Sequence, residues 1–318
     1  SYTGQRTGWL PASNRNKRRK PISTAATPRF QLLTVKRLLH PLLSHPRFAH
    51  TAKYIVYTSL VINGFLYIRD DYIAAISALP ADASLYDYFT QVATSIDTIG
   101  WLGLVFLLEL ETYAVPDEKW TAWLGNVIRT LRVFCYISIA SATWGYTAEA
   151  LENYESTEVP GVTNACEMAD QGIFLQPNQF EYIEITAQNC ASLSDGDRFL
   201  RIANEVSVVD EATLGHLQFH GWLDVENAFV WLIVVLLIEI ELWLQTRDRF
   251  ASPVMGAVRQ AKSFFYLLLI LNIFIWYYQD YPRYAWDAFL WIFGFWAIEM
   301  NLAEWEMERV EELQEKKS

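Results

Sequence analysis

The sequence lacks the motifs that are typical of enzymes. It contains no phosphate-binding G-x-x-x-x-G-K loop, no G-x-S-x-G nucleophile elbow, no H-E-x-x-H zinc motif and no C-x-x-C-H haem motif. The apolar segments described below also have no histidine at the depth of a haem ligand. We therefore expect that the protein is not an enzyme and that it binds no cofactor.

Glycine and proline are scarce in the apolar segments, and the 318 residues include only 14 Gly and 11 Pro. Many secondary transporters interrupt their membrane helices at such residues, and voltage sensors contain a regular series of arginines. Neither pattern occurs, which counts against both classes. The formal net charge is −11, and many of the positive charges lie beside apolar segments or in the cluster Arg15–Lys20. We therefore expect no nucleic-acid partner.

Hydrophobic residues are abundant, at 52% of the chain, and aromatic residues reach 15%. This composition is typical of a membrane protein with aromatic belts. A helix of about 20 residues crosses the hydrocarbon core, and six apolar segments approach that length. They are residues 52–70, 96–114, 129–148, 227–246, 260–279 and 285–303. We therefore predict an all-α integral membrane protein with six transmembrane helices, three within 52–148 and three within 226–303, in contact with the lipid bilayer.

The distribution of lysine and arginine predicts the orientation of these helices. The second and fourth loops are flanked by many positive residues, whereas the first, third and fifth loops have few. Because cytoplasmic loops are enriched in Lys and Arg, both termini are predicted to be cytoplasmic, in a plasma membrane of the bacterial inner-membrane type. Residues 1–51 are predicted to form a basic tail with a helix on the membrane surface, and residues 304–318 a charged tail.

A tryptophan followed eight positions later by a glutamate occurs three times, and the second residue after each glutamate is polar. The three sets are Trp101, Glu109 and Glu111; Trp231, Glu239 and Glu241; and Trp291, Glu299 and Asn301. The helix that precedes each set begins with a cation and has a tyrosine four residues later, as in Lys53 and Tyr57. This repetition predicts that the six helices form three repeated helical hairpins.

Ionisable side chains are costly in a membrane helix and usually have a role there. Two interpretations stay open. The glutamates and cations form ion pairs that fix helix packing, or the glutamates converge on a pseudo-threefold axis and form a proton or ion path. The candidates for either role are Glu109, Glu111, Glu239, Glu241, Glu299, Lys53, Arg129, Arg132, Arg259 and Lys262.

Residues 149–225 form a long loop that is predicted to fold outside the membrane as a small subdomain. Cys166 and Cys190 bracket a predicted β-hairpin within Gly172–Ala187. On the extracytoplasmic side they are expected to form a disulfide, with two free thiols as the alternative. His216 and His220 are four residues apart and would share a helix face, which is a weak indication of a zinc site. The alternative is an amphipathic segment that leads into the following helix.

The repeated intramembrane glutamates favour an ion channel or a channel-like membrane subunit. Such a protein would act as a homo-oligomer or with partner membrane subunits, on inorganic cations or protons. The alternative is a non-transporting scaffold or accessory subunit of a larger complex, in which the glutamates form structural ion pairs. The folded loop and the charged tail offer surfaces for partners and favour this alternative.

Overall fold

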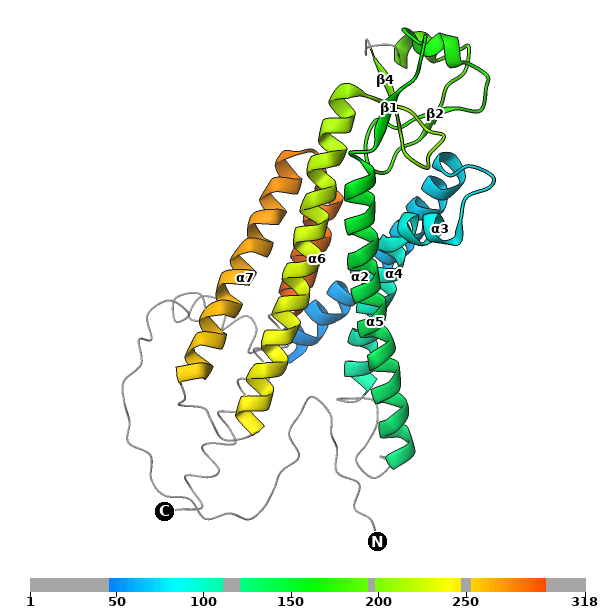
Figure 1. Ribbon diagram of the computed structural model, residues 1–318. Helices are drawn as coiled ribbons and strands as arrows, with labels where there is room; N and C mark the ends of the chain where they lie inside the picture. The colour runs from blue at the N-terminus through cyan, green and yellow to red at the C-terminus, as the bar shows by residue number, and fades with distance from the viewer. Residues whose placement is uncertain (1–45, 111–120, 194–197, 247–252, 296–318) are drawn as a thin grey trace, which may run out of the picture.

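A computed structural model describes residues 46–110, 121–193, 198–246 and 253–295 of the chain (Figure 1). About 74% of the structure is helical. The helices are α2 (Pro46–Ala78), α3 (Leu85–Gln91), α4 (Ala93–Glu109), α5 (Ala122–Glu152), α6 (Glu211–Thr246) and α7 (Pro253–Tyr278). Residues 282–295 form a further helical segment. The helices form one bundle, in which α4 packs against α2 and α5, and α6 packs against α5 and α7.

Local sequence signals explain where several helices begin. Ser84 precedes α3 and accepts a hydrogen bond from the backbone N–H of Asp87, whose carboxylate accepts from the N–H of Ser84, so the two form a capping box. Thr121 precedes α5, and its hydroxyl accepts from the N–H of Leu124 at 3.2 Å. These caps satisfy N–H groups that lack a partner within the helix.

Small residues allow α4 and α5 to approach closely. A Cβ atom added to Gly100 of α4 would lie 2.8 Å from Cγ1 of Ile139, and one added to Gly145 of α5 would lie 2.7 Å from Cβ of Ala93. Real Cβ atoms do not tolerate such distances, so both positions require glycine while the helices keep this separation. The close contact fixes the packing of α4 on α5.

The loop between α5 and α6 folds into a small subdomain at one end of the bundle (Figure 1). It contains an antiparallel sheet of β1 (Ser156–Glu158), β4 (Phe199–Ile202) and β5 (Val209–Asp210), in the order β1-β4-β5. A second pair, β2 (Phe174–Leu175) and β3 (Ile183–Glu184), is the predicted hairpin, with Phe174 opposite Glu184. The 3-10 turns η3 (Ala165–Met168) and η4 (Cys190–Leu193) are joined by the disulfide between Cys166 and Cys190, which confirms that prediction.

The prediction of six transmembrane helices is wrong. Each predicted segment overlaps a helix, but among the described helices only α7 has both the length and the apolar composition of a membrane span. Helices α3 and α4 pass the same test only together, and a bend of 62° separates them. Alone, α4 has only 17 residues, and α2, α5 and α6 contain charged side chains that reduce their mean hydropathy. Examples are Lys53, Arg69, Asp70, Arg129, Arg132, Glu226 and Glu239.

Several predicted features lie outside the described residues. These are the basic tail within 1–45, the charged tail 304–318, Glu111, Glu299 and Asn301. The predicted cytoplasmic location of both termini therefore stays a prediction.

Candidate functional site

The three repeated tryptophans meet at the centre of the bundle. Trp101 comes from α4, Trp231 from α6 and Trp291 from the segment 282–295. The ring centroid of Trp101 lies 5.7 Å from that of Trp231 and 5.9 Å from that of Trp291. Trp101 and Trp231 are buried in the same apolar core. The repeat in the sequence therefore corresponds to a spatial cluster, which we call the tryptophan cluster.

A polar residue stands four positions before each tryptophan of the cluster. These residues are Asp97, Asn227 and Asp287. Residues four apart lie on the same helix face, so each polar side chain shares a face with its tryptophan. Asp224, one helical turn before Asn227, joins them. All four residues line a single cavity of about 80 Å³ beside the tryptophan cluster.

Aromatic side chains form most of the remaining wall of this cavity. Its lining includes Tyr67, Trp101, Tyr146, Trp231, Trp276, Tyr284, Trp291 and Phe295, together with Thr94 and Thr98. We call it the aspartate cavity. The lining combines carboxylates, hydroxyls and aromatic rings. Its residues come from α2, α4, α5, α6, α7 and residues 282–295.

Burial changes the protonation of the carboxylates in the cavity. Burial raises the pKa of Asp224 from 3.8 to about 7, although Gln179 donates a hydrogen bond of 2.9 Å to its Oδ2 atom. Burial likewise raises the pKa of Asp287 to about 6, against the effect of a 2.9 Å hydrogen bond from Asn63. A low-dielectric environment disfavours the ionised carboxylate. Both groups therefore exchange protons near neutral pH.

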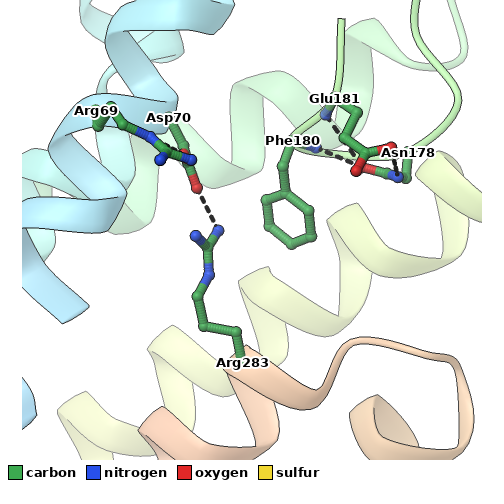
Figure 2. Close-up of polar contacts among 6 residues, drawn as sticks. All are labelled: Arg69, Asp70, Asn178, Phe180, Glu181 and Arg283. Carbon is green, nitrogen blue, oxygen red and sulfur yellow. Dashed lines mark hydrogen bonds and ion pairs between the residues drawn. The ribbon is translucent and has the colours of Figure 1, made fainter.

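The cation nearest to this group, Arg283, is engaged outside the cavity. Its guanidinium forms an ion pair with Asp70 of α2 and lies over the rings of Tyr67 and Phe180, with Cζ 5.1 and 4.8 Å from the ring centroids. Figure 2 shows Arg283 extending towards Asp70, next to Phe180 of the loop subdomain. Asp70 also pairs with Arg69 at 2.9 Å. Arg283 therefore joins α2 to the loop subdomain.

The loop subdomain contacts residues that line the aspartate cavity. Phe180 stacks on Tyr284 with a centroid distance of 5.0 Å and contacts Tyr281 at 5.3 Å, and its neighbour Gln179 bonds to Asp224. The Asn178 side chain accepts hydrogen bonds from the N–H groups of Phe180 and Glu181 (Figure 2). This turn holds Gln179 and Phe180 against the cavity.

Among the predicted glutamates, the three within the described residues lie apart from the cavity and have polar partners. Glu109 accepts from Lys53 Nζ at 2.5 Å and from Tyr57 Oη at 2.8 Å. Glu241 accepts from Arg259 Nε at 2.8 Å and from Lys262 Nζ at 2.7 Å. The two clusters are not equivalent in the repeat. Glu109 is the first glutamate of its set and pairs with Lys53 of its own hairpin, whereas Glu241 is the second glutamate of its set and pairs with Lys262 of the next hairpin.

The remaining charged candidates are more exposed. Glu239 accepts a hydrogen bond of 3.2 Å from Tyr136 at an exposed site. Arg129 is exposed on α5, and Arg132 is half-buried there. The structure therefore distributes the predicted residues over separate contacts between helices.

The two candidate zinc ligands have different surroundings. His216 is exposed, whereas His220 is fully buried, and its ring centroid lies 4.2 Å from that of Tyr281. Burial lowers the pKa of His220 to about 4, so its ring is neutral at physiological pH. Within the described ranges, no three His, Cys, Asp or Glu side chains are placed to hold a metal ion together.

The aspartates that line the cavity were not predicted from the sequence. The predicted sites were the glutamates that follow the tryptophans, whereas the aspartates precede them. A polar residue four positions before each tryptophan was a visible signal. Asp224 belongs to no repeat, and only the fold places it beside Asp97 and Asp287.

Comparison of the chain with protein-family models, with curated proteins and with solved structures gave no match.

Proposed function

We propose that the protein is a membrane-associated, channel-like subunit that binds a small cation in the aspartate cavity. The observation that carries this proposal is the presence of Asp97, Asp224 and Asp287 in the lining of one cavity. The neighbouring Arg283 is engaged with Asp70. A buried carboxylate is stable only when it is protonated, hydrogen-bonded or paired with a cation. The cavity therefore favours protons and small cations over neutral or negative ligands.

Helix α7 and the outer faces of the bundle support membrane association. Only 17% of the most apolar stretch of α7 is buried, which is low for a core helix of a soluble protein. Large apolar side chains are exposed on several helices, among them Phe65, Phe106, Phe134, Ile137 and Phe264. Contiguous exposed apolar surface is typical of contact with a membrane or with partner subunits.

The glutamate clusters favour a second candidate function, that of a structural scaffold. Glu109 and Glu241 each have two partners on a neighbouring helix. Such pairs hold helices together and leave no carboxylate for an ion path at these positions. In this alternative the aspartate cavity is a structural centre without a mobile ligand.

Ion flux in liposomes tests the first proposal. The test variant is Asp97→Asn/Asp224→Asn/Asp287→Asn, and the control is Glu239→Gln, which alters an exposed glutamate. We expect cation or proton flux from the wild type and from the control, and a loss of at least about tenfold in the triple variant. Thermal melting checks that the variant is folded. A folded triple variant with wild-type flux, or a wild type without flux, would contradict the proposal.

A further inference from the structure

Three polar atoms on the wall of the aspartate cavity are buried without a hydrogen-bond partner in the described structure. They are Oη of Tyr67, Nε1 of Trp276 and Oδ1 of Asp97. Tyr67 is only 4% exposed and Trp276 only 2%. A buried polar group that lacks a hydrogen-bond partner destabilises the folded state. Three such groups at one cavity indicate that a ligand with hydrogen-bonding groups completes the site.

The chemistry of these atoms limits the ligand. The carboxylate of Asp97 accepts hydrogen bonds, so the ligand needs a donor. The indole of Trp276 can only donate, so the ligand also needs an acceptor. The hydroxyl of Tyr67 can do either. A metal ion or a simple alkylammonium ion has no acceptor and would leave Trp276 unsatisfied.

The aromatic lining favours an organic cation over an inorganic one. A cation over the face of a tryptophan or tyrosine is stabilised by the ring quadrupole, and quaternary ammonium ligands are recognised in this way. Ca²⁺ and Mg²⁺ prefer cages of oxygen ligands. Here the oxygen atoms of Asp97, Asp224 and Asp287 are interspersed with the rings of Trp101, Trp231 and Trp276.

The volume of the cavity limits the size of the ligand. In the same measure as the 80 Å³ of this cavity, one water requires about 10–15 Å³. The cavity therefore has room for about five to eight water-sized groups. This range includes an ammonium group joined to a hydroxyl by a short carbon chain.

We infer that the aspartate cavity binds a small amino alcohol, with its ammonium group at the aspartates and its hydroxyl at Trp276 and Tyr67. Ethanolamine has this chemistry. The inference rests on the cation binding proposed above and names the class of cation. The amine occurs free and as the head of a phospholipid, in which the hydroxyl is esterified to phosphate and its oxygen can still accept a hydrogen bond, and the experiment distinguishes these two sources.

Calorimetric titration of the purified full-length protein in detergent tests the inference. Ethanolamine is compared with propylammonium, in which a methyl group replaces the hydroxyl. We expect ethanolamine to bind at least about tenfold more tightly than propylammonium, as one good hydrogen bond would give. Sodium and potassium are titrated in parallel.

Two pairs of variants test the role of the unsatisfied atoms. Trp276→Phe removes the buried donor, and Trp286→Phe is its control because Trp286 is 48% exposed. Tyr67→Phe removes the hydroxyl, and Tyr72→Phe is its control at 64% exposure. We expect the two buried variants to lose the preference for ethanolamine over propylammonium while retaining ammonium binding. The two exposed controls should keep the preference.

The outcomes separate this inference from the function on which it rests. Equal affinity for ethanolamine and propylammonium, or binding of sodium or potassium alone, would overturn the amino alcohol and leave cation binding intact. If none of the tested cations binds in the cavity, both the amino-alcohol inference and the proposed cation binding would be overturned. Nanodiscs address the source: a melting temperature raised by phosphatidylethanolamine over phosphatidylglycerol, in the wild type but not in Trp276→Phe, assigns the site to a lipid head group. Binding of free ethanolamine without that lipid effect assigns it to the free amine.

Discussion

Replacing Asp224 by asparagine is expected to remove part of the pH dependence of the protein's stability. The carboxylate lines the aspartate cavity, and burial raises its pKa from 3.8 to about 7. Asparagine has nearly the same shape, and its carbonyl oxygen can accept the hydrogen bond that Gln179 donates to Asp224. The substitution therefore removes the titration with little change in packing.

The sign follows from linkage between protonation and folding. Because the folded state binds this proton more tightly than the unfolded state, the stabilising contribution is complete below about pH 4 and is lost as the pH rises to about 7. Each pKa unit corresponds to about 1.4 kcal/mol. Raising the pH from 5 to 8 crosses about two units of this window, so Asp224 alone lowers the free energy of unfolding by at most about 3 kcal/mol.

Chemical unfolding in detergent at several pH values measures this effect. We expect the free energy of unfolding of the wild type to fall between pH 5 and 8. For Asp224→Asn the fall should be smaller, by up to about 3 kcal/mol. The exposed Asp82 provides a control, because Asp82→Asn should follow the wild-type curve. Parallel curves for the wild type and Asp224→Asn would refute the assignment of a buried, protonated carboxyl to this position.

Further predictions concern packing, the disulfide and the glutamate clusters. Gly100→Ala should lower stability by about 1–3 kcal/mol through contact with Cγ1 of Ile139, and in a double-mutant cycle of thermal melts its cost should be smaller in an Ile139→Ala background, which lacks that atom. Cys190→Ser opens a loop of 24 residues and should cost about 3 kcal/mol, with faster proteolysis within 156–210 and an unchanged bundle as the checks. Glu241→Gln should destabilise the protein by about 2 kcal/mol in chemical unfolding, whereas the exposed Glu239→Gln should cost below about 0.5 kcal/mol. Equal losses in these two variants would contradict the structural role of the Glu241 cluster.

The sequence predicted the positions of the helices better than their environment. Periodic apolar segments place the helices correctly, because local apolar content and helix formation are closely linked. The number of membrane spans was overestimated, since segments such as α2 and α6 were judged with their charged ends included. Charged residues such as Lys53 and Glu241 face neighbouring helices, and a pattern in one helix does not show that. The hairpin and the disulfide of the loop depend on short-range signals and were predicted.

The candidate site was predicted only in part. The repeat correctly drew attention to Trp101, Trp231 and Trp291. The residues predicted as the site were, however, the glutamates that follow each tryptophan by eight positions. Which face of a helix meets the centre of a bundle depends on contacts between distant segments, such as the bond between Asn63 and Asp287. Such contacts leave no local trace in a single sequence.

The second copy of the repeat has Asn227 where the other two copies have an aspartate, and this difference affects how the cavity orients a ligand. With an aspartate four positions before every tryptophan, the cavity would have three equivalent walls, and a ligand could bind in three equivalent orientations. Asn227 replaces one carboxylate by an amide, while Asp97 and Asp287 keep the other two. Asp224, one helical turn before Asn227, returns a carboxylate to the same wall. The divergence of one copy thus breaks the rotational degeneracy, because the carboxylate of the α6 wall lies one turn away from the position that Asp97 and Asp287 occupy in their copies.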